Sequence, residues 1–201
     1  DFSTNALNKP VNNWNSSLRN GKKAEVKQIA GTNKKWMELQ GRDASPKNIQ
    51  YPLPQNFELS FDIAAPKDIP WGAKAFELYL GTKPTYDQMV SPAIKLRIKA
   101  GYWGRPGEIS IQGKFADGYF ANVKPYFEAT GFSNDKELNT AKITLKRKGE
   151  SLELFMGENK IVEMSKAIPV TTTFNFLKFI HISSDSDLEK YYISNFKITK
   201  Q

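Results

Sequence analysis

Large apolar and polar residues alternate along much of this chain. In residues 57–63 (FELSFDI), phenylalanine, leucine and isoleucine fill every second position, and Glu58, Ser60 and Asp62 lie between them. Successive side chains of a β-strand point to opposite faces, so this alternation predicts strands with one buried and one solvated face, as in antiparallel sheets. The same pattern recurs in the segments 76–80, 94–98, 143–145, 152–156 and 192–198.

Less regular segments complete the predicted set of strands. Weaker strands are expected at 24–29, 35–39, 108–112, 119–127 and 160–163. Residues 174–182 (FNFLKFIHI) are apolar on both faces, which favours a central strand that is covered on both sides or carries a bulge. Gly149 and Gly157 lie in predicted tight hairpin turns. No helical period is sustained, and the many short strands between glycines and prolines predict an all-β, two-sheet antiparallel sandwich.

Composition limits the possible classes of protein but points to no particular reaction. The 201 residues, 39% of them hydrophobic, suit a single domain over 1–201 with one core. The absence of cysteine excludes disulfides, thiolate metal sites and thiol catalysis. The net charge of +8 is dispersed along the chain, so no nucleic-acid partner is expected. No apolar run approaches the ~20 residues of a membrane span, and no signal-peptide pattern is found.

Several short motifs, in a fixed order, give the chain a family resemblance. They are the opening DFS, Trp14, residues 24–26 (AEV), 35–39 (KWMEL), 53–62 (LPQNFELSFD), 146–155 (KRKGESLELF) and 191–198 (YYISNFKI). This order resembles the soluble N-terminal region of OmpA-family envelope proteins from Bacteroidetes, and more broadly the concanavalin-A-like and laminin-G-like jelly rolls. The resemblance covers nearly the whole chain and is weakest between about residues 64 and 135.

The resemblance implies a concanavalin-A-like jelly roll in which the first and last strands are neighbours. It also implies a bacterial cell-envelope location, periplasmic or associated with the outer membrane. Family members usually continue into a peptidoglycan-binding domain, which this sequence lacks. Trp14 and Trp36 align with core-like positions of the family, so they are interpreted as structural.

Paired carboxylates are the first chemistry to look for in this class of sandwich. Retaining glycoside hydrolases need two carboxyl groups about 5–5.5 Å apart. The nearest approach here is Glu58 and Asp62, which are four residues apart, or about 13 Å along an extended strand, with Ser60 between them. This segment is therefore predicted to be a solvated strand face, although a pair built from separate strands stays open.

The sequence gives little support for a metal site or for a Ser-His-Asp catalytic triad. Asp185, Asp187 and Glu189 form the densest acidic cluster, which could hold a structural calcium but lacks the glycine and spacing of an EF-hand loop. An acidic loop is the favoured interpretation, and no other cofactor is expected. His181 is the only histidine and lies in an apolar strand, which favours a packed, hydrogen-bonded side chain over a catalytic base.

Aromatic residues in predicted loops are the better candidates for ligand binding. Flat rings stack on the C–H faces of sugars while polar side chains hold the hydroxyls. Trp71, Tyr102 and Trp103 lie in such loops, and Arg105 adds a fork of donors suited to hydroxyls or to an acidic sugar. Tyr86 is a weaker candidate. The alternative is that these rings cap the open ends of the core.

Basic residues on two strands suggest another surface. Lys95, Arg97 and Lys99 share the polar face of one strand, and the polar face of 142–148 carries three more lysines. On one sheet face they would form a basic plate for an anionic glycan or lipopolysaccharide. Solubility and protection against edge pairing are the plainer explanation.

Three functions remain open. The favoured one is a non-catalytic carbohydrate- or ligand-binding module whose partner is a glycan or another envelope component. A structural or protein-interaction domain of an envelope protein is the first alternative. A glycoside hydrolase of the sandwich class is the second, so enzymatic activity is undecided but disfavoured by the missing carboxylate motif. The sequence does not define the oligomeric state.

Overall fold

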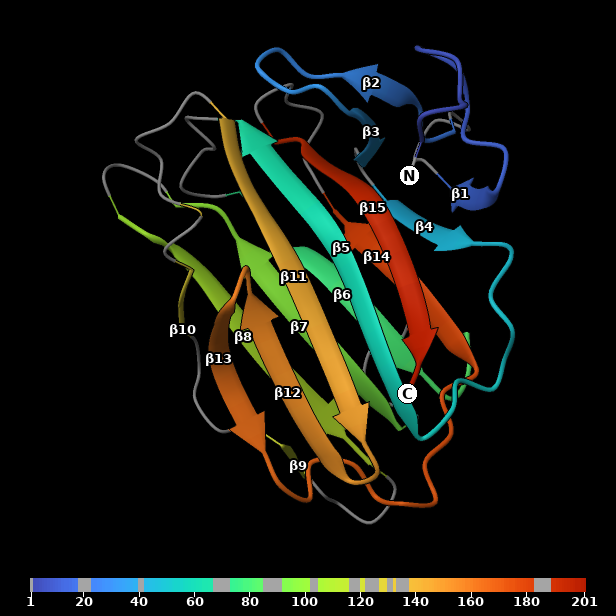
Figure 1. The fold of residues 1–201 in the computed structure, drawn as a ribbon, viewed down its shortest axis with the longest axis vertical. Helices are drawn as coiled ribbons and strands as arrows, with labels where there is room; N and C mark the ends of the chain where they lie inside the picture. Colours follow the sequence, from blue (N-terminus) through green and yellow to red (C-terminus); the bar gives the residue numbers. More distant parts are fainter. Residues whose placement is uncertain are drawn as a thin grey trace.

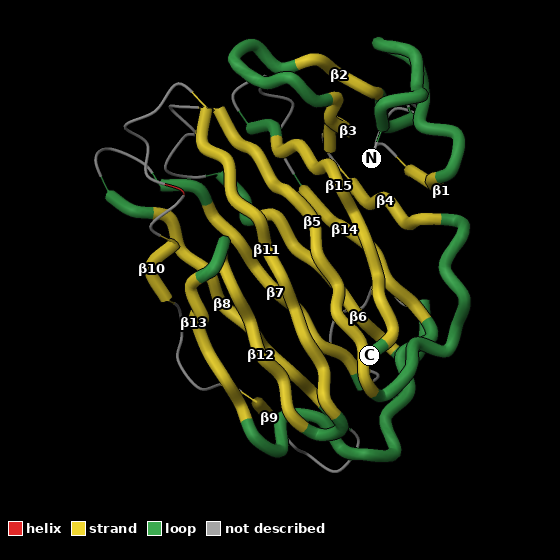
Figure 2. Tube along the Cα trace, viewed as in Figure 1, coloured by secondary structure: helices red, strands yellow, loops and turns green. Residues whose placement is uncertain are grey.

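A computed structural model shows two antiparallel β-sheets packed face to face (Figures 1 and 2). It describes residues 2–17, 23–39, 42–66, 73–84, 92–101, 105–115, 120–121, 127–129, 132, 138–182 and 189–201. Within these residues the chain forms fifteen strands. In the same residues, no helix has the length and apolar content needed to cross a bilayer.

Sheet 1, as we call the larger sheet, has the strand order β1-β4-β14-β6-β7-β8-β10, and β9 pairs with β8 beside this path. Its strands are β1 (Trp14–Ser17), β4 (Arg42–Pro46), β6 (Phe76–Gly81), β7 (Ala93–Lys99), β8 (Gly107–Lys114), β9 (Phe120–Ala121), β10 (Phe127–Ala129) and β14 (Phe176–His181). β14, β6 and β7 are central strands, flanked on both sides.

Sheet 2 has seven strands in the order β13-β12-β11-β5-β15-β3-β2. They are β2 (Val26–Gln28), β3 (Lys35–Leu39), β5 (Asn56–Pro66), β11 (Leu138–Lys148), β12 (Ser151–Met156), β13 (Asn159–Met164) and β15 (Tyr191–Lys200). β5 lies between β11 and β15, so segments distant in sequence form the middle of this sheet (Figure 1).

Two tight hairpins join β11, β12 and β13. Lys148 pairs with Ser151 around Gly149, and Met156 pairs with Asn159 around Gly157. Both glycines have positive φ, +59° and +61°, and occupy the first loop position, where a type II′ turn requires this conformation. The tight hairpin turns predicted at Gly149 and Gly157 are confirmed.

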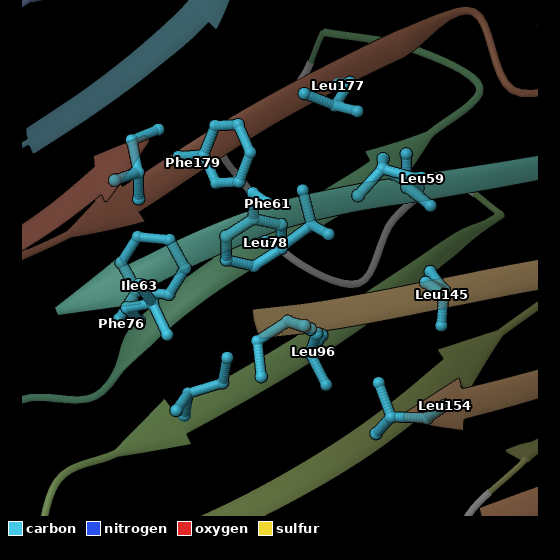
Figure 3. Packing of buried hydrophobic residues seen from close by; sticks show 14 of the residues in the cluster. Leu59, Phe61, Ile63, Phe76, Leu78, Leu96, Leu145, Leu154, Leu177 and Phe179 are labelled. Carbon is cyan, nitrogen blue, oxygen red and sulfur yellow. The ribbon is translucent and has the colours of Figure 1, made fainter. Parts of the chain in front are cut away.

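The core lies between the two sheets and is filled by the apolar side of the alternating pattern. Leu59, Phe61 and Ile63 of β5 face Leu78 of β6 and Phe179 of β14 across the sandwich (Figure 3). All five side chains are buried. The two-sheet antiparallel sandwich predicted from the alternation is therefore confirmed.

Some expectations change in detail. The segment 174–182 does form a central strand, β14, buried on both faces. β1 and β4 were not predicted, and the strand expected at 119–127 corresponds to β9 and the first residue of β10, with 119 and 122–126 outside the described residues. The first and last strands do not pair, since β1 belongs to sheet 1 and β15 to sheet 2, but Trp14 contacts Phe196 across the sandwich with ring centroids 5.5 Å apart.

Both tryptophans interpreted as structural are buried, in different places. Trp14 belongs to the main core. Trp36 alternates with inward-facing Met37 and so lies on the outer side of β3, where it is nonetheless fully buried. Its Nε1 donates a hydrogen bond to Thr32 Oγ1 (3.0 Å), and the Lys34 ammonium lies 5.2 Å from the ring centroid.

Candidate functional site

The outer face of sheet 1 carries an ordered row of side chains, four polar and one apolar. Register places Asp43 of β4 opposite Ile180 of β14, Ile180 opposite Glu77 of β6, Glu77 opposite Arg97 of β7, and Arg97 opposite Ser110 of β8. The residues of one such row point to the same face, because the side chains of paired residues lie on the same side of a sheet. Five strands thus contribute to a single line of side chains.

A second row runs parallel to the first. It contains Lys178, Tyr79, Lys95 and Gln112, again in register across four strands. Lys178 lies 5.7 Å from the centre of the Tyr79 ring. Both lysines and the tyrosine are buried although they face outward from the sheet, so this face is not a simple solvated surface.

Ion pairs fix the centre of this face. Glu77 Oε1 accepts a hydrogen bond from Arg97 Nε (3.0 Å), and Glu77 Oε2 lies 3.8 Å from Lys95 Nζ. Burial lowers the pKa of Lys95, and the charge of Glu77 opposes this shift. A carboxylate between two cations is held in one position.

A cavity of about 250 Å³ opens next to Glu77. It is lined by Lys74, Ala75, Glu77, Arg97, Ile180 and Ile182. The side chain of Glu77 is 13% exposed and that of Arg97 45%, so ligand can reach the guanidinium more readily than the carboxylate. Ile182 is 42% exposed, so it adds an accessible apolar contact.

This combination of groups suits binding better than bond cleavage. Carboxylate oxygens accept and guanidinium nitrogens donate hydrogen bonds to hydroxyl groups, while isoleucine side chains contact C–H surfaces. Among the described residues that line the cavity, Glu77 is the only carboxylate. A glycosidase of the two-carboxylate type needs a partner about 5–9.5 Å away, and the groups that hold Glu77 are cations.

Of the five ligand-binding residues predicted from sequence, the structure describes Arg105 alone. Trp71, Tyr86, Tyr102 and Trp103 lie outside the described residues, so their assignment to a binding site stays a prediction. Arg105 is described and exposed, in the connection between β7 and β8. It does not line the cavity beside Glu77.

The acidic cluster is likewise divided. Asp185 and Asp187 lie outside the described residues, whereas Glu189 is buried. In the described part of the chain no three histidine or carboxylate side chains are placed to hold a metal ion. The calcium hypothesis therefore stays a prediction.

His181 is structural, as the sequence indicated. Its ring is buried, its Nε2 donates a hydrogen bond to the Glu189 carbonyl oxygen (2.6 Å), and it packs edge-on against Tyr191 at 4.7 Å. Burial lowers its pKa, and the hydrogen bond to the Glu189 carbonyl opposes this shift. A neutral histidine held in the core serves packing rather than proton transfer.

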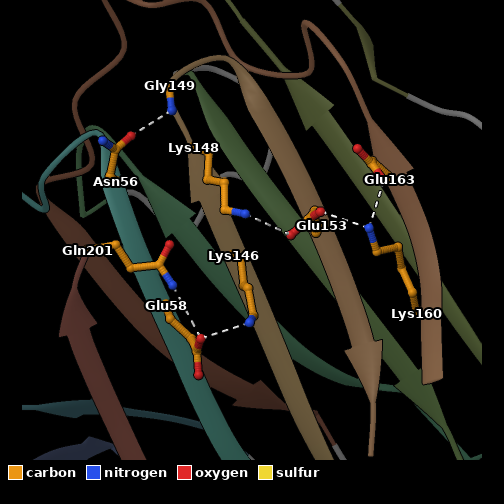
Figure 4. Close-up of polar contacts among 9 residues, drawn as sticks. All are labelled: Asn56, Glu58, Lys146, Lys148, Gly149, Glu153, Lys160, Glu163 and Gln201. Carbon is orange, nitrogen blue, oxygen red and sulfur yellow. Dashed lines mark hydrogen bonds and ion pairs between the residues drawn. The ribbon is translucent and has the colours of Figure 1, made fainter. Parts of the chain in front are cut away.

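The Glu58–Asp62 segment is a solvated strand face, also as predicted. Glu58 pairs with Lys146 (3.0 Å), and Asp62 pairs with Lys34 (2.6 Å) and accepts a hydrogen bond from Asn195 (2.7 Å). Figure 4 shows the Glu58 contact on the outer side of sheet 2. Each carboxylate is thus engaged by its own cation, in the manner of a surface ion pair.

The prediction that basic residues of two strands form one plate is wrong. β7 with Lys95 belongs to sheet 1, and β11 with Lys146 belongs to sheet 2, so their polar faces lie on opposite sides of the sandwich. The charges are also paired with acids: Lys95 with Glu77, and Lys148 with Glu153 (3.7 Å; Figure 4). The sequence pattern identified the polar positions of these strands but could not say which sheet each strand joins.

The most informative residues of the cavity were missed by sequence reasoning. Glu77, Ile180, Ile182 and Lys74 were not singled out, and Arg97 was noted only for its charge. Glu77 and Arg97 occupy polar positions of two predicted strands, with opposite charges. That complementarity was a usable signal, because oppositely charged residues often face each other on paired strands.

Solved structures with the same architecture include proteins that bind or cleave carbohydrates. The carbohydrate-binding module CBM66 from Bacillus subtilis aligns over 92% of this chain and 94% of its own, with a TM-score of 0.52 and 11% identity. The β-glucanase of Bacillus licheniformis aligns over 97% and 95%, with a TM-score of 0.56 and 10% identity. The ligand-binding domain of botulinum neurotoxin serotype D, solved with N-acetylneuraminic acid, has a TM-score of 0.58 and 14% identity.

The comparisons define the fold. The chain is a concanavalin-A-like sandwich and is similar in structure, at low identity, to carbohydrate-binding modules. It aligns over 91% of its own length but only 44% of the neurotoxin chain. No family model and no curated protein matches the sequence.

Proposed function

We propose that this chain is a non-catalytic carbohydrate-binding module and that it binds its glycan on the outer face of sheet 1, at the cavity beside Glu77. One observation carries the proposal: a hollow in which a fixed Glu77–Arg97 pair lies next to the exposed apolar side chain of Ile182. Polar groups of fixed geometry beside an apolar contact are what a sugar ring requires.

The comparisons support this proposal through the fold alone. Similar sandwiches include a carbohydrate-binding module and a domain solved with N-acetylneuraminic acid. A β-glucanase shares the architecture too, so the fold is compatible with hydrolysis. The single carboxylate of the cavity, placed between Lys95 and Arg97, favours binding over cleavage.

The proposed location is the bacterial cell envelope, periplasmic or associated with the outer membrane. It rests on the resemblance of segments such as 53–62 and 191–198 to the OmpA-family envelope proteins of Bacteroidetes. Fractionation of the source cells with an antibody against this chain tests it. Recovery in the envelope fraction would support the location, and recovery with cytosolic markers would refute it.

A glycan array tests the proposed function. Wild type is compared with Glu77→Gln and Arg97→Gln, which alter the cavity, and with Trp103→Ala, which alters a predicted loop aromatic. Glu163→Gln is the matched control, since Glu163 is a half-exposed carboxylate on β13 of the other sheet, paired with Lys160.

We expect wild type and the control to bind the same glycans and the two cavity variants to bind them more weakly. Loss with Trp103→Ala alone would move the site to the loops. No binding by wild type across the array would overturn the proposal and favour the protein-interaction alternative.

A further inference from the structure

The hydrogen bond between Arg97 and Glu77 uses only the Nε of the Arg97 guanidinium. Its Nε donates to Glu77 Oε1 at 3.0 Å, and within the described part of the chain no hydrogen bond involves its two terminal nitrogens. The side chain is 45% exposed and lines the cavity. The planar pair of terminal N–H groups is the part of arginine that binds a carboxylate with two parallel hydrogen bonds.

A second cation lines the same cavity. Lys74 is exposed, and the described residues provide it with no ion pair or hydrogen bond. Glu77 is already engaged by Arg97 Nε and lies 3.8 Å from Lys95 Nζ. Lys74 and Arg97 therefore line the cavity together with one carboxylate, so its lining carries one excess positive charge that a neutral ligand would leave uncompensated.

The remaining wall is apolar and the space is small. Ile180 is buried, Ile182 is 42% exposed, and Ala75 also lines the cavity. The volume, about 250 Å³, is below the roughly 300–1,000 Å³ of sites for drug-sized ligands. One sugar ring of a longer chain fits this description better than a large aromatic compound.

We propose that the cavity selects a carboxylate-bearing sugar. The carboxylate binds the terminal nitrogens of Arg97 and the ammonium of Lys74, and the C–H surface of the ring contacts Ile182. This inference rests on the proposed function and deepens it, from glycans in general to acidic glycans.

Isothermal titration calorimetry at low salt tests the preference with two acidic probes and their neutral counterparts. Trigalacturonic acid is compared with its fully methyl-esterified form, and 3′-sialyllactose with lactose, which separates a uronic from a sialic source of the carboxylate. We expect at least one acidic probe to bind about 10- to 100-fold more tightly than its neutral counterpart, the range that hydrogen bonds to a charged group provide. The advantage shrinks as salt is added.

Variants locate the effect. Arg97→Gln and Lys74→Gln should each remove most of the preference for the acid, and Arg97→Lys, which keeps the charge but loses the fork, should remove part of it. Lys197→Gln is the matched control, an exposed lysine on β15 of the other sheet. It should leave binding unchanged. Circular dichroism and urea unfolding confirm that each variant is folded.

The outcomes separate this inference from the proposed function. Equal binding of acidic and neutral probes, lost in Arg97→Gln, would overturn the selectivity and leave a neutral glycan site in place. An acidic preference that survives both Arg97→Gln and Lys74→Gln would refute this cavity as its source. If none of the four probes binds while the glycan array identifies a neutral ligand, the inference fails alone, and if the array is also silent, both fail.

Discussion

Replacing Phe179 by alanine removes a ring that contacts aromatic side chains of both sheets. The ring is fully buried on the inner face of β14. Its centroid lies 5.7 Å from those of both Trp14 and Phe76 in sheet 1, and 5.1 Å and 5.5 Å from those of Phe61 and Phe196 in sheet 2. The variant therefore tests whether the layered architecture depends on this contact.

The expected loss follows from these contacts. A buried phenylalanine replaced by alanine costs about 3–5 kcal/mol, through lost transfer free energy and the cavity left behind. Each aromatic pair adds about 0.5–1.5 kcal/mol beyond the area term, and Phe179 makes four such pairs. The free energy of unfolding should fall by about 5 kcal/mol, a large part of the 5–15 kcal/mol typical of a folded domain.

Urea unfolding followed by tryptophan fluorescence measures this loss. Phe155→Ala is the control, because Phe155 lies half-buried on the outer side of β12, with the ammonium groups of Lys146 and Lys160 within 6 Å of its ring centre. We expect the control to lose less than about 2 kcal/mol, as a partly exposed site leaves no closed cavity. Equal losses for the two variants, or a loss below about 2 kcal/mol for Phe179→Ala, would refute the inference that packing of Phe179 against both sheets stabilises the fold.

Three further predictions concern the backbone and buried titratable groups. Gly149→Ala should lower the free energy of unfolding by about 1–2 kcal/mol in a urea titration, because φ at this hairpin position is +59°, and an unchanged midpoint would contradict the turn assignment. Because burial lowers the pKa of His181, its side chain binds a proton more readily in the unfolded chain than in the folded one. The free energy of unfolding should therefore be unaffected by this group above about pH 6.5 and should fall as the pH drops below that value. His181→Phe should flatten this dependence between about pH 5 and 7. Burial raises the pKa of Tyr191, so stability should fall above about pH 10, where this tyrosine ionises only in the unfolded chain. Tyr191→Phe should reduce this fall, and it should cost about 1–3 kcal/mol at pH 7, since the Ala100 amide loses its acceptor.

The sequence was most informative where a strand has one buried and one solvated face. β5 shows this best, since Phe57, Leu59 and Phe61 are buried and Glu58 and Asp62 are half-buried on the outer side. β4 (RDASP) contains no large apolar residue and forms a strand because it pairs with β14. Arg147 is another exception: it occupies an inward position of β11 and is fully buried, where it donates hydrogen bonds to the carbonyl oxygens of Gly149 and Thr172. Pairing with distant segments decides both cases, and a single sequence does not specify it.

The candidate site was less predictable for the same reason. Its residues come from β6, β7, β14 and the residues next to them, and they meet only because the strand order of sheet 1 joins segments about a hundred residues apart in the chain. Glu77 and Arg97 were recognisable as polar positions. That Ile182 lies beside them follows from the pairing of β14 with β6, which periodicity cannot reveal.

The position of β15 in the middle of sheet 2 sets an order of events during synthesis. β5 pairs with β11 on one side and with β15 on the other. While the nascent chain still lacks residues 191–200, that second edge of β5 stays unpaired and can pair with another chain. Closing so many long-range pairings is slow, so this edge of β5 stays open to other chains until β15 has been translated and has paired.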